Sequence, residues 1–195
     1  IGIVSSYRSK KVREVKKALW VSNYWDSIDI LHAFLSKYIN EYKLRAAVFM
    51  NYDCSRIEDS NEEKEYLSEI YGKKVNIQYR NKKQLTTYKG VDESNIVIGF
   101  RSTVFREVFA WGKKILNCDF TGTNLYNDYD SMIMFTEPYY DAFKRRVNEL
   151  RREPYEEYRK RTKDYASYIM NNDPDCPPHL FIRKKIEEHL KIFPE

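Results

Sequence analysis

A small polar loop connects a predicted buried strand, residues 95–99, to a predicted helix, residues 102–112. Gly99 lets the backbone turn closely, and Arg101 carries a planar guanidinium that suits a phosphate or a carboxylate. Ser102 belongs to the residue types that cap helices, and the free N–H groups of a first helical turn attract anions. These residue types in this order predict an anion-binding site in the loop.

Two further residues extend this candidate site. Thr103 supplies a second hydroxyl, and Glu107 lies four residues further on, near the same end of the helix. A carboxylate there can accept hydrogen bonds from the hydroxyls of a ribose or another sugar. A purely structural interpretation stays open, because Ser-Thr before a helix is ordinary capping and Glu107 would then be a solvated charge.

Polar residues also follow two other predicted strands. Ser5, Ser6 and Arg8 come after the first strand, and Tyr79 and Arg80 stand at the end of the third. In an open parallel sheet the ligand crevice lies beyond the carboxyl ends of the strands. We therefore expect these loops to meet at one edge of the sheet.

The apolar pattern alternates between strands and helices along most of the chain. Strands are predicted at 1–4, 44–50, 74–79, 95–99, 113–118 and 131–135, and helices at 27–42, 60–72, 84–90 and 102–112. Ser60 with Glu63 three residues later resembles a capping box, and Gly72 is placed to end the same helix. Such alternation predicts an α/β fold, with a Rossmann-like, mainly parallel sheet and helices on both faces.

The pattern of apolar residues changes after Pro138. Residues 1–136 are predicted to form the Rossmann-like domain, and residues 137–195 a C-terminal helical extension packed on it. Apolar residues recur at helical spacing in this extension, and a break at 171–179 precedes a last predicted helix at 180–192.

Composition limits the possible classes of protein. The 195 residues are 42% hydrophobic and 32% charged, which is typical of a globular chain. No apolar run approaches the roughly 20 residues that cross a bilayer. Cys54, Cys118 and Cys176 are too few and too scattered for a disulfide framework, which favours a cytoplasmic setting. The net charge of +5 suits an anionic ligand, but acidic residues are interleaved almost throughout.

Other residues that could do chemistry receive plainer interpretations. Asp128 and Asp130 imitate a metal-binding Asp-x-Asp motif but lie in a loop rich in Asn, Gly and Tyr. His32 falls on the apolar side of its helix, as a packed histidine does. His179 and His189 have no third partner nearby, so no metal site is expected.

The stretch "VIGFRSTVFREVFAWGKKIL" resembles the donor-binding half of GT-B glycosyltransferases, especially bacterial enzymes of surface-polysaccharide synthesis. CDP-glycerol glycerophosphotransferases have a similar stretch. The resemblance covers residues 1–135 in element order and residues 95–116 in detail. It implies that Ser102 and Thr103 meet a diphosphate, that Arg101 meets a phosphate or an acidic sugar, and that Glu107 meets a ribose or sugar hydroxyl.

The same resemblance implies further roles. Ser5 and Ser6, with Arg8, would approach the diphosphate, and Tyr79 and Arg80 would bind the base. The implied partners are a nucleotide-sugar donor and an N-terminal acceptor-binding domain of the same parent protein, which would supply the catalytic base. No metal, other cofactor or nucleic acid is implied, and peripheral membrane association is left open. The chain departs from commoner patterns, since it has no glycine-rich loop before the serines and no histidine in the motif.

Two alternatives remain open from the sequence. Residues 144–163 interleave basic residues with tyrosines, as in modules that bind nucleic acid or anionic surfaces. Acidic residues dilute that charge, and the tyrosines fall on one helical stripe, as core residues do. The other alternative is a nucleotide-binding domain that is not a transferase, such as half of a sugar-nucleotide epimerase.

Overall fold

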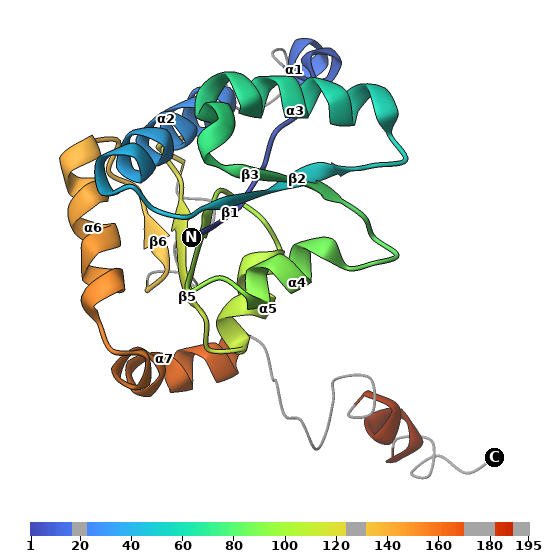
Figure 1. The fold of residues 1–195 in the computed structure, drawn as a ribbon. Helices are drawn as coiled ribbons and strands as arrows, with labels where there is room; N and C mark the ends of the chain where they lie inside the picture. Colours follow the sequence, from blue (N-terminus) through green and yellow to red (C-terminus); the bar gives the residue numbers. More distant parts are fainter. Residues whose placement is uncertain (17–22, 124–131, 170–181, 189–195) are drawn as a thin grey trace.

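The computed structural model describes residues 1–16, 23–123, 132–169 and 182–188 (Figure 1). Its strands form one sheet in the order β3-β2-β1-β4-β5-β6, and every neighbouring pair is parallel. The α/β Rossmann-like architecture predicted from the alternating pattern is therefore confirmed. In chain order the strands are β1 (Gly2–Val4), β2 (Ala47–Asp53), β3 (Asn76–Arg80), β4 (Ile96–Gly99), β5 (Lys114–Cys118) and β6 (Met134–Phe135).

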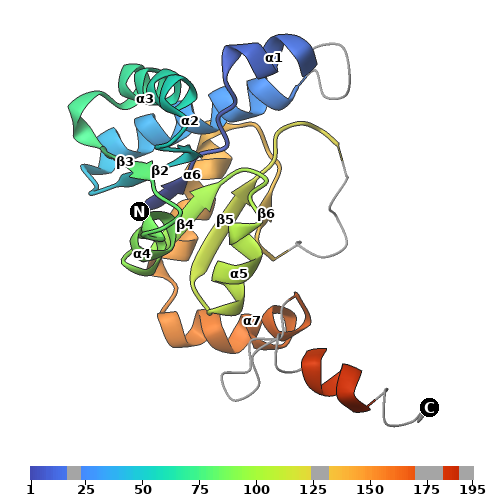
Figure 2. The same ribbon diagram turned by 90° about the vertical axis from the view of Figure 1, so that its right-hand side faces the viewer.

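Helices cover both faces of the sheet (Figures 1 and 2). One face carries α2 and α3, with α6 beside α2, and the other carries α4 and α5, with α7 beside α5. The helices are α1 (Lys10–Lys16), α2 (Tyr24–Tyr42), α3 (Ile57–Tyr71), the 3-10 turn η1 (Gly72–Lys74), α4 (Thr86–Asp92), α5 (Val104–Ala110), α6 (Tyr140–Arg152) and α7 (Tyr155–Ile169). Residues 182–188 are also helical.

The strand order places a topological switch between β1 and β4. From β1 the chain builds outward through β2 and β3, then returns to lay β4 against the other side of β1. Gly2 consequently lies opposite Ala47 on one side and Val97 on the other. Loops that leave β1 and β4 in different directions open a crevice at the carboxyl ends of these strands. This is where the sequence predicts the polar loops to meet.

Strands β1 and β4, at the middle of the sheet, are apolar and have both faces buried, whereas β3, at one edge, is polar and partly exposed. All residues of β1, β4 and β5 are buried, as expected for a parallel sheet covered by helices on both sides. In the extension, Phe143 and Val147 of α6 and Tyr158 of α7 are buried in the same core. Side chains at 182–187 are instead exposed, with Ile182 57% and Ile186 55% accessible. The expected break at 171–179 lies outside the described residues.

Helix α3 starts earlier than the sequence predicts. It begins at Ile57, so Ser60 lies inside the helix and its predicted role as N-cap is wrong. The amide of Ser60 already donates to the carbonyl of Arg56 at 2.9 Å, as in continuing helix. Gly72 does follow the last residue of α3, with a φ of 60° that favours glycine.

His32 is buried in the core beneath α3, as predicted for a packed histidine. Its Nδ1 lies 2.7 Å from the Tyr71 hydroxyl, and the ring meets the rings of Tyr66 and Tyr71 edge-on. Burial, with a smaller contribution from the positive charge of Arg13, lowers the pKa of His32 to about 4. His32 is therefore neutral at pH 7.

The buried imidazole makes stability depend on pH. Because the pKa of His32 is lower in the folded than in the unfolded chain, its stabilising effect is complete above about pH 6.5 and is lost as the pH falls toward 4. A pKa difference of about 2.5 corresponds to roughly 3 kcal/mol. We expect the free energy of unfolding, measured by urea titration between pH 4.5 and 7.5, to fall more steeply with decreasing pH in the wild type than in His32→Gln. Parallel curves would mean that His32 is not buried in its neutral form.

Gly99 packs too closely for any side chain. A Cβ there would lie 2.5 Å from the Val4 carbonyl oxygen and 2.8 Å from Cζ of Phe105. Gly99→Ala should therefore lower the free energy of unfolding by about 1–3 kcal/mol in urea titrations. Ser68→Ala, on the exposed side of α3, serves as a control and should stay within about 0.5 kcal/mol of the wild type. An unchanged midpoint for Gly99→Ala would contradict this packing.

Candidate functional site

A cavity of about 300 Å³ lies at the carboxyl ends of the strands, beside the switch between β1 and β4. Four segments supply its walls: the loop after β1, the end of β2, the connection from β3 to α4, and the loop from β4 into α5. The lining residues are Val4, Ser5, Ser6, Arg8, Met50, Asn51, Arg80, Asn81, Lys82, Leu85, Thr86, Thr87, Tyr88, Arg101, Ser102, Thr103 and Val104.

The cavity is positively charged. Arg8, Arg80, Lys82 and Arg101 line it, and no aspartate or glutamate does so among the described residues. Arg80 donates from Nη1 to the Asn51 carbonyl at 2.9 Å, which holds it at the end of β2. Arg8 and Lys82 form no salt bridge within the described part of the chain. Arg8 and Lys82 act at longer range on the Glu63 and Asp53 carboxylates, and because neither forms an ion pair with them, both can still contact an anion.

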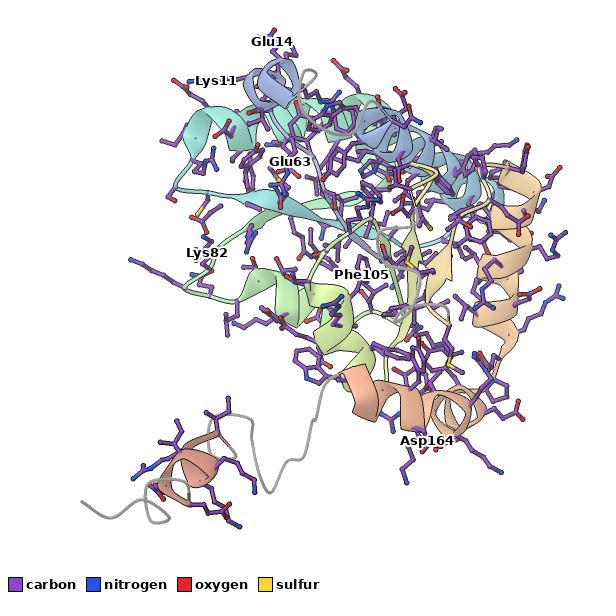
Figure 3. All side chains as sticks on the ribbon, turned by 180° about the vertical axis from the view of Figure 1, so that it is seen from behind. Lys11, Glu14, Glu63, Lys82, Phe105 and Asp164 are labelled. Atoms are coloured by element: carbon purple, nitrogen blue, oxygen red, sulfur yellow. The ribbon has the colours of Figure 1, made fainter. Side chains whose placement is uncertain are left out.

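A buried carboxylate outside the cavity lining holds two of the residues that line it, Ser5 and Asn51. Glu63 of α3 is fully buried between α3 and the sheet (Figure 3). Its Oε1 accepts hydrogen bonds from the Asn51 amide at 2.8 Å and from the Ser5 hydroxyl at 2.5 Å, and its Oε2 accepts from the Tyr52 amide at 2.9 Å. Burial raises the pKa of Glu63, although these donors oppose that change. One side chain thus ties the loop after β1 to the end of β2.

The two predicted serines of the first loop use their hydroxyl hydrogens inside the protein. Ser5 donates to Glu63, and Ser6 donates to the Phe100 carbonyl. Each hydroxyl has a single hydrogen, so these groups can offer a ligand only their lone pairs. The structure brings Ser5 and Ser6 to the cavity as predicted, but their hydroxyls position the loops and do not point a donor at a phosphate.

Arg101 is held by the loop that follows β5. Its Nε donates to Asp119 Oδ2 at 2.7 Å, and its Nη2 donates to the hydroxyls of Thr121 and Thr123 at 3.0 and 2.6 Å. Its own amide donates to Asn117 Oδ1 at 3.0 Å, and its φ is 45°. The side chains of Arg101 and Asp119 are 11% and 3% exposed. Arg101 lines the cavity as predicted, but its charge is compensated by Asp119, so its clearest role is to fix the backbone of this loop.

Ser102 and Thr103 also line the cavity, as the sequence predicts. Helix α5 begins at Val104 with Thr103 as the N-cap, and no side chain caps it, so the expected cap at Ser102 is not formed. Neither hydroxyl has a hydrogen-bond partner among the described residues, which leaves both able to donate to a ligand. Because α5 has only seven residues, we assign the attraction for anions to side-chain cations and not to the helix.

Three predicted residues lie outside the cavity lining. Gly99 is buried in the packing of β4. Glu107 accepts a hydrogen bond from the Tyr88 hydroxyl at 2.7 Å, which links α5 to α4. Tyr79 is 37% exposed, and Lys64 Nζ lies 5.1 Å from the centre of its ring. A contact of Glu107 or Tyr79 with a ligand stays a prediction.

The connection from β3 to α4 forms one wall of the cavity, and the sequence predicts only its first residue, Arg80. Lys82 lies at this turn (Figure 3), and its amide donates to Asp53 Oδ2 at 2.9 Å. The Ser55 hydroxyl and the amides of Lys82 and Ser55 lower the pKa of Asp53 to about 2, so the anchor stays ionised. Leu85 and Tyr88 follow in the same wall. The run of polar residues after β3 was the available signal for this wall.

The alternative based on residues 144–163 loses part of its support. Tyr158 is buried, and its hydroxyl accepts a hydrogen bond from the Ile115 amide at 3.3 Å. Tyr165 packs edge-on against Phe109, with ring centres 6.3 Å apart. These rings are engaged in packing and are not a free stacking surface.

No group of His, Cys, Asp and Glu suited to a metal ion occurs in the described ranges. Asp128, Asp130, His179 and His189 lie outside those ranges. Among the described helices, none combines the length and apolar character that a membrane span requires.

No family model matches this chain, and no match was found among curated proteins or solved structures.

Glu63 gives a direct test of how the cavity is held. Glu63→Ala leaves the amides of Asn51 and Tyr52 without acceptors, and should lower the free energy of unfolding by about 3 kcal/mol in urea titrations. Glu65→Ala, at an exposed position of the same helix, is the matched control and should change it by less than about 0.5 kcal/mol. Equal effects of the two substitutions would show that Glu63 does not anchor these strands.

Proposed function

We propose that this chain is the donor-binding domain of a GT-B glycosyltransferase that acts in polysaccharide or glycan biosynthesis and binds a nucleotide sugar. The observation that carries the proposal is the cavity at the switch between β1 and β4, which is lined by cations and hydroxyls and by no acidic residue in the described part of the chain. In doubly wound sheets, ligands bind at this place, and dinucleotides and FMN are among them. The resemblance of residues 95–116 to the donor-binding half of these enzymes supports the same conclusion.

In this proposal, the cations and the hydroxyls of the cavity have different roles. Arg8 and Lys82, which have no salt bridge among the described residues, attract the diphosphate, and Ser102 and Thr103 donate hydrogen bonds to it. Displacement at the anomeric carbon leaves a nucleoside diphosphate that gains negative charge, and the same cations stabilise it. The acceptor site and the catalytic base belong, in this proposal, to an N-terminal domain of the same parent protein working in the cytoplasm.

Nucleotide binding can be measured directly on this chain. Titration calorimetry with UDP, CDP, GDP and CMP should detect binding of at least one nucleoside diphosphate. Arg8→Ala and Lys82→Ala should each weaken it about tenfold, because each removes a charge-assisted contact.

Neighbouring residues supply the controls. Lys83→Ala and Lys11→Ala remove the same charge close by, from residues that do not line the cavity, and should leave the affinity within about twofold. Binding of none of the three nucleoside diphosphates would overturn the proposal. Equal losses in the cavity variants and the control variants would reduce it to general attraction between a basic protein and an anion.

A further inference from the structure

The backbone of Leu85 has a conformation that leucine rarely adopts. Leu85 immediately precedes α4 with φ 52° and ψ 39°, in the left-handed region. Its side chain is 55% exposed and lines the cavity. The left-handed conformation is strained for a bulky side chain, and an exposed leucine recovers little of that strain through burial.

The other two non-glycine residues described with positive φ are accounted for locally. Lys43 ends α2 as a polar residue in a left-handed C-cap, a common way to end a helix. Arg101 places its guanidinium in the network with Asp119. Leu85 has neither explanation. Glycine or asparagine would suit its backbone better.

The turn that carries Leu85 is firmly built. The Asn81 amide donates to the Thr86 hydroxyl at 2.9 Å, and that hydroxyl donates to the Tyr79 carbonyl at 3.0 Å. The Gln84 amide donates to Asn81 Oδ1 at 3.2 Å. These bonds hold the turn in place, so the apolar side chain of Leu85 stays at the cavity. Strained residues held by their surroundings are concentrated at binding sites.

The rest of this wall is also fixed. The Tyr88 hydroxyl is bonded to Glu107, and the Tyr88 ring lies 5.9 Å from the ring of Trp111, centre to centre. Arg8, Ser102 and Thr103 lie on the walls formed by the loops after β1 and β4, whereas the wall before α4 carries Lys82 and, three residues further on, the apolar side chain of Leu85. Leu85 therefore adds an apolar surface beside the cations of the cavity.

We propose that Leu85 is a specificity-determining residue whose side chain forms the apolar surface on which the nucleobase of the donor packs. This inference rests on the proposed function, since it assigns a place to the base of the same nucleotide. It also places the base against the start of α4 and not against Tyr79, which lies outside the cavity lining. The strain at Leu85 is retained because an apolar side chain is needed there.

The test separates the base from the phosphates. Affinities of the full chain for UDP, CDP, GDP and inorganic pyrophosphate are measured by calorimetry for the wild type, Leu85→Gly and Leu85→Met. Leu85→Gly should weaken the best-bound nucleotide about tenfold and change pyrophosphate binding less than twofold, while the thermal midpoint of the free protein stays equal or rises. Leu85→Met keeps an apolar surface and should retain nucleotide affinity.

Lys43→Gly is the matched control, because it relieves the same backbone conformation away from the cavity. It should leave both affinities unchanged. Nucleotide affinity that is equal in Leu85→Gly and the wild type, or equal losses for nucleotide and pyrophosphate, would overturn the role of Leu85 while leaving the proposed function intact. Absence of binding by all of the nucleotides, whether or not pyrophosphate binds, would overturn the proposed function itself.

Discussion

The site depends on one buried carboxylate. Glu63 carries an ionisable side chain and has no solvent exposure. Burial of an unpaired carboxylate is costly. Here two backbone amides and the Ser5 hydroxyl satisfy it, so the cost of burial is offset by hydrogen bonds that no apolar residue could make. Those partners lie at the carboxyl ends of β1 and β2. The carboxylate therefore determines where the loop after β1 leaves the sheet, and with it the position of Ser6 and Arg8.

A second anchor acts on the opposite side of the switch. Asp119 and Asn117 hold Arg101 by its side chain and its amide, and the turn at Arg101 brings Ser102 and Thr103 to the cavity. Both anchors are buried polar groups outside the cavity lining, and each includes a hydrogen bond from a backbone amide. The cavity-lining groups that take no part in these anchors remain able to bind a ligand. Preorganisation of this kind lowers the entropy that binding must overcome.

The fold was accessible from sequence because its signals are local and repeated. Apolar runs alternate with amphipathic helices, and β4, α5 and β5 lie within a residue or two of their predicted limits. Glu63 was misread for a clear reason: with Ser60 it imitates a capping box, and only the packing of α3 on the sheet reveals that its partners are Asn51 and Tyr52. The pairing of Arg101 with Asp119 was equally hidden, since it spans two loops. Spacing predicted which loops meet, but not which hydroxyls would already be engaged.

The all-parallel sheet also has a consequence for how the chain folds. Each strand pair closes only after an intervening crossover, and the pair at the switch sets Gly2 beside Val97. Contacts between such distant positions carry a large loop-closure entropy and tend to form slowly. During synthesis, β1 can pair with β2 long before β4 has left the ribosome, but one of its edges stays open until then. The two loops that face each other across the cavity thus meet only after β4 has been made.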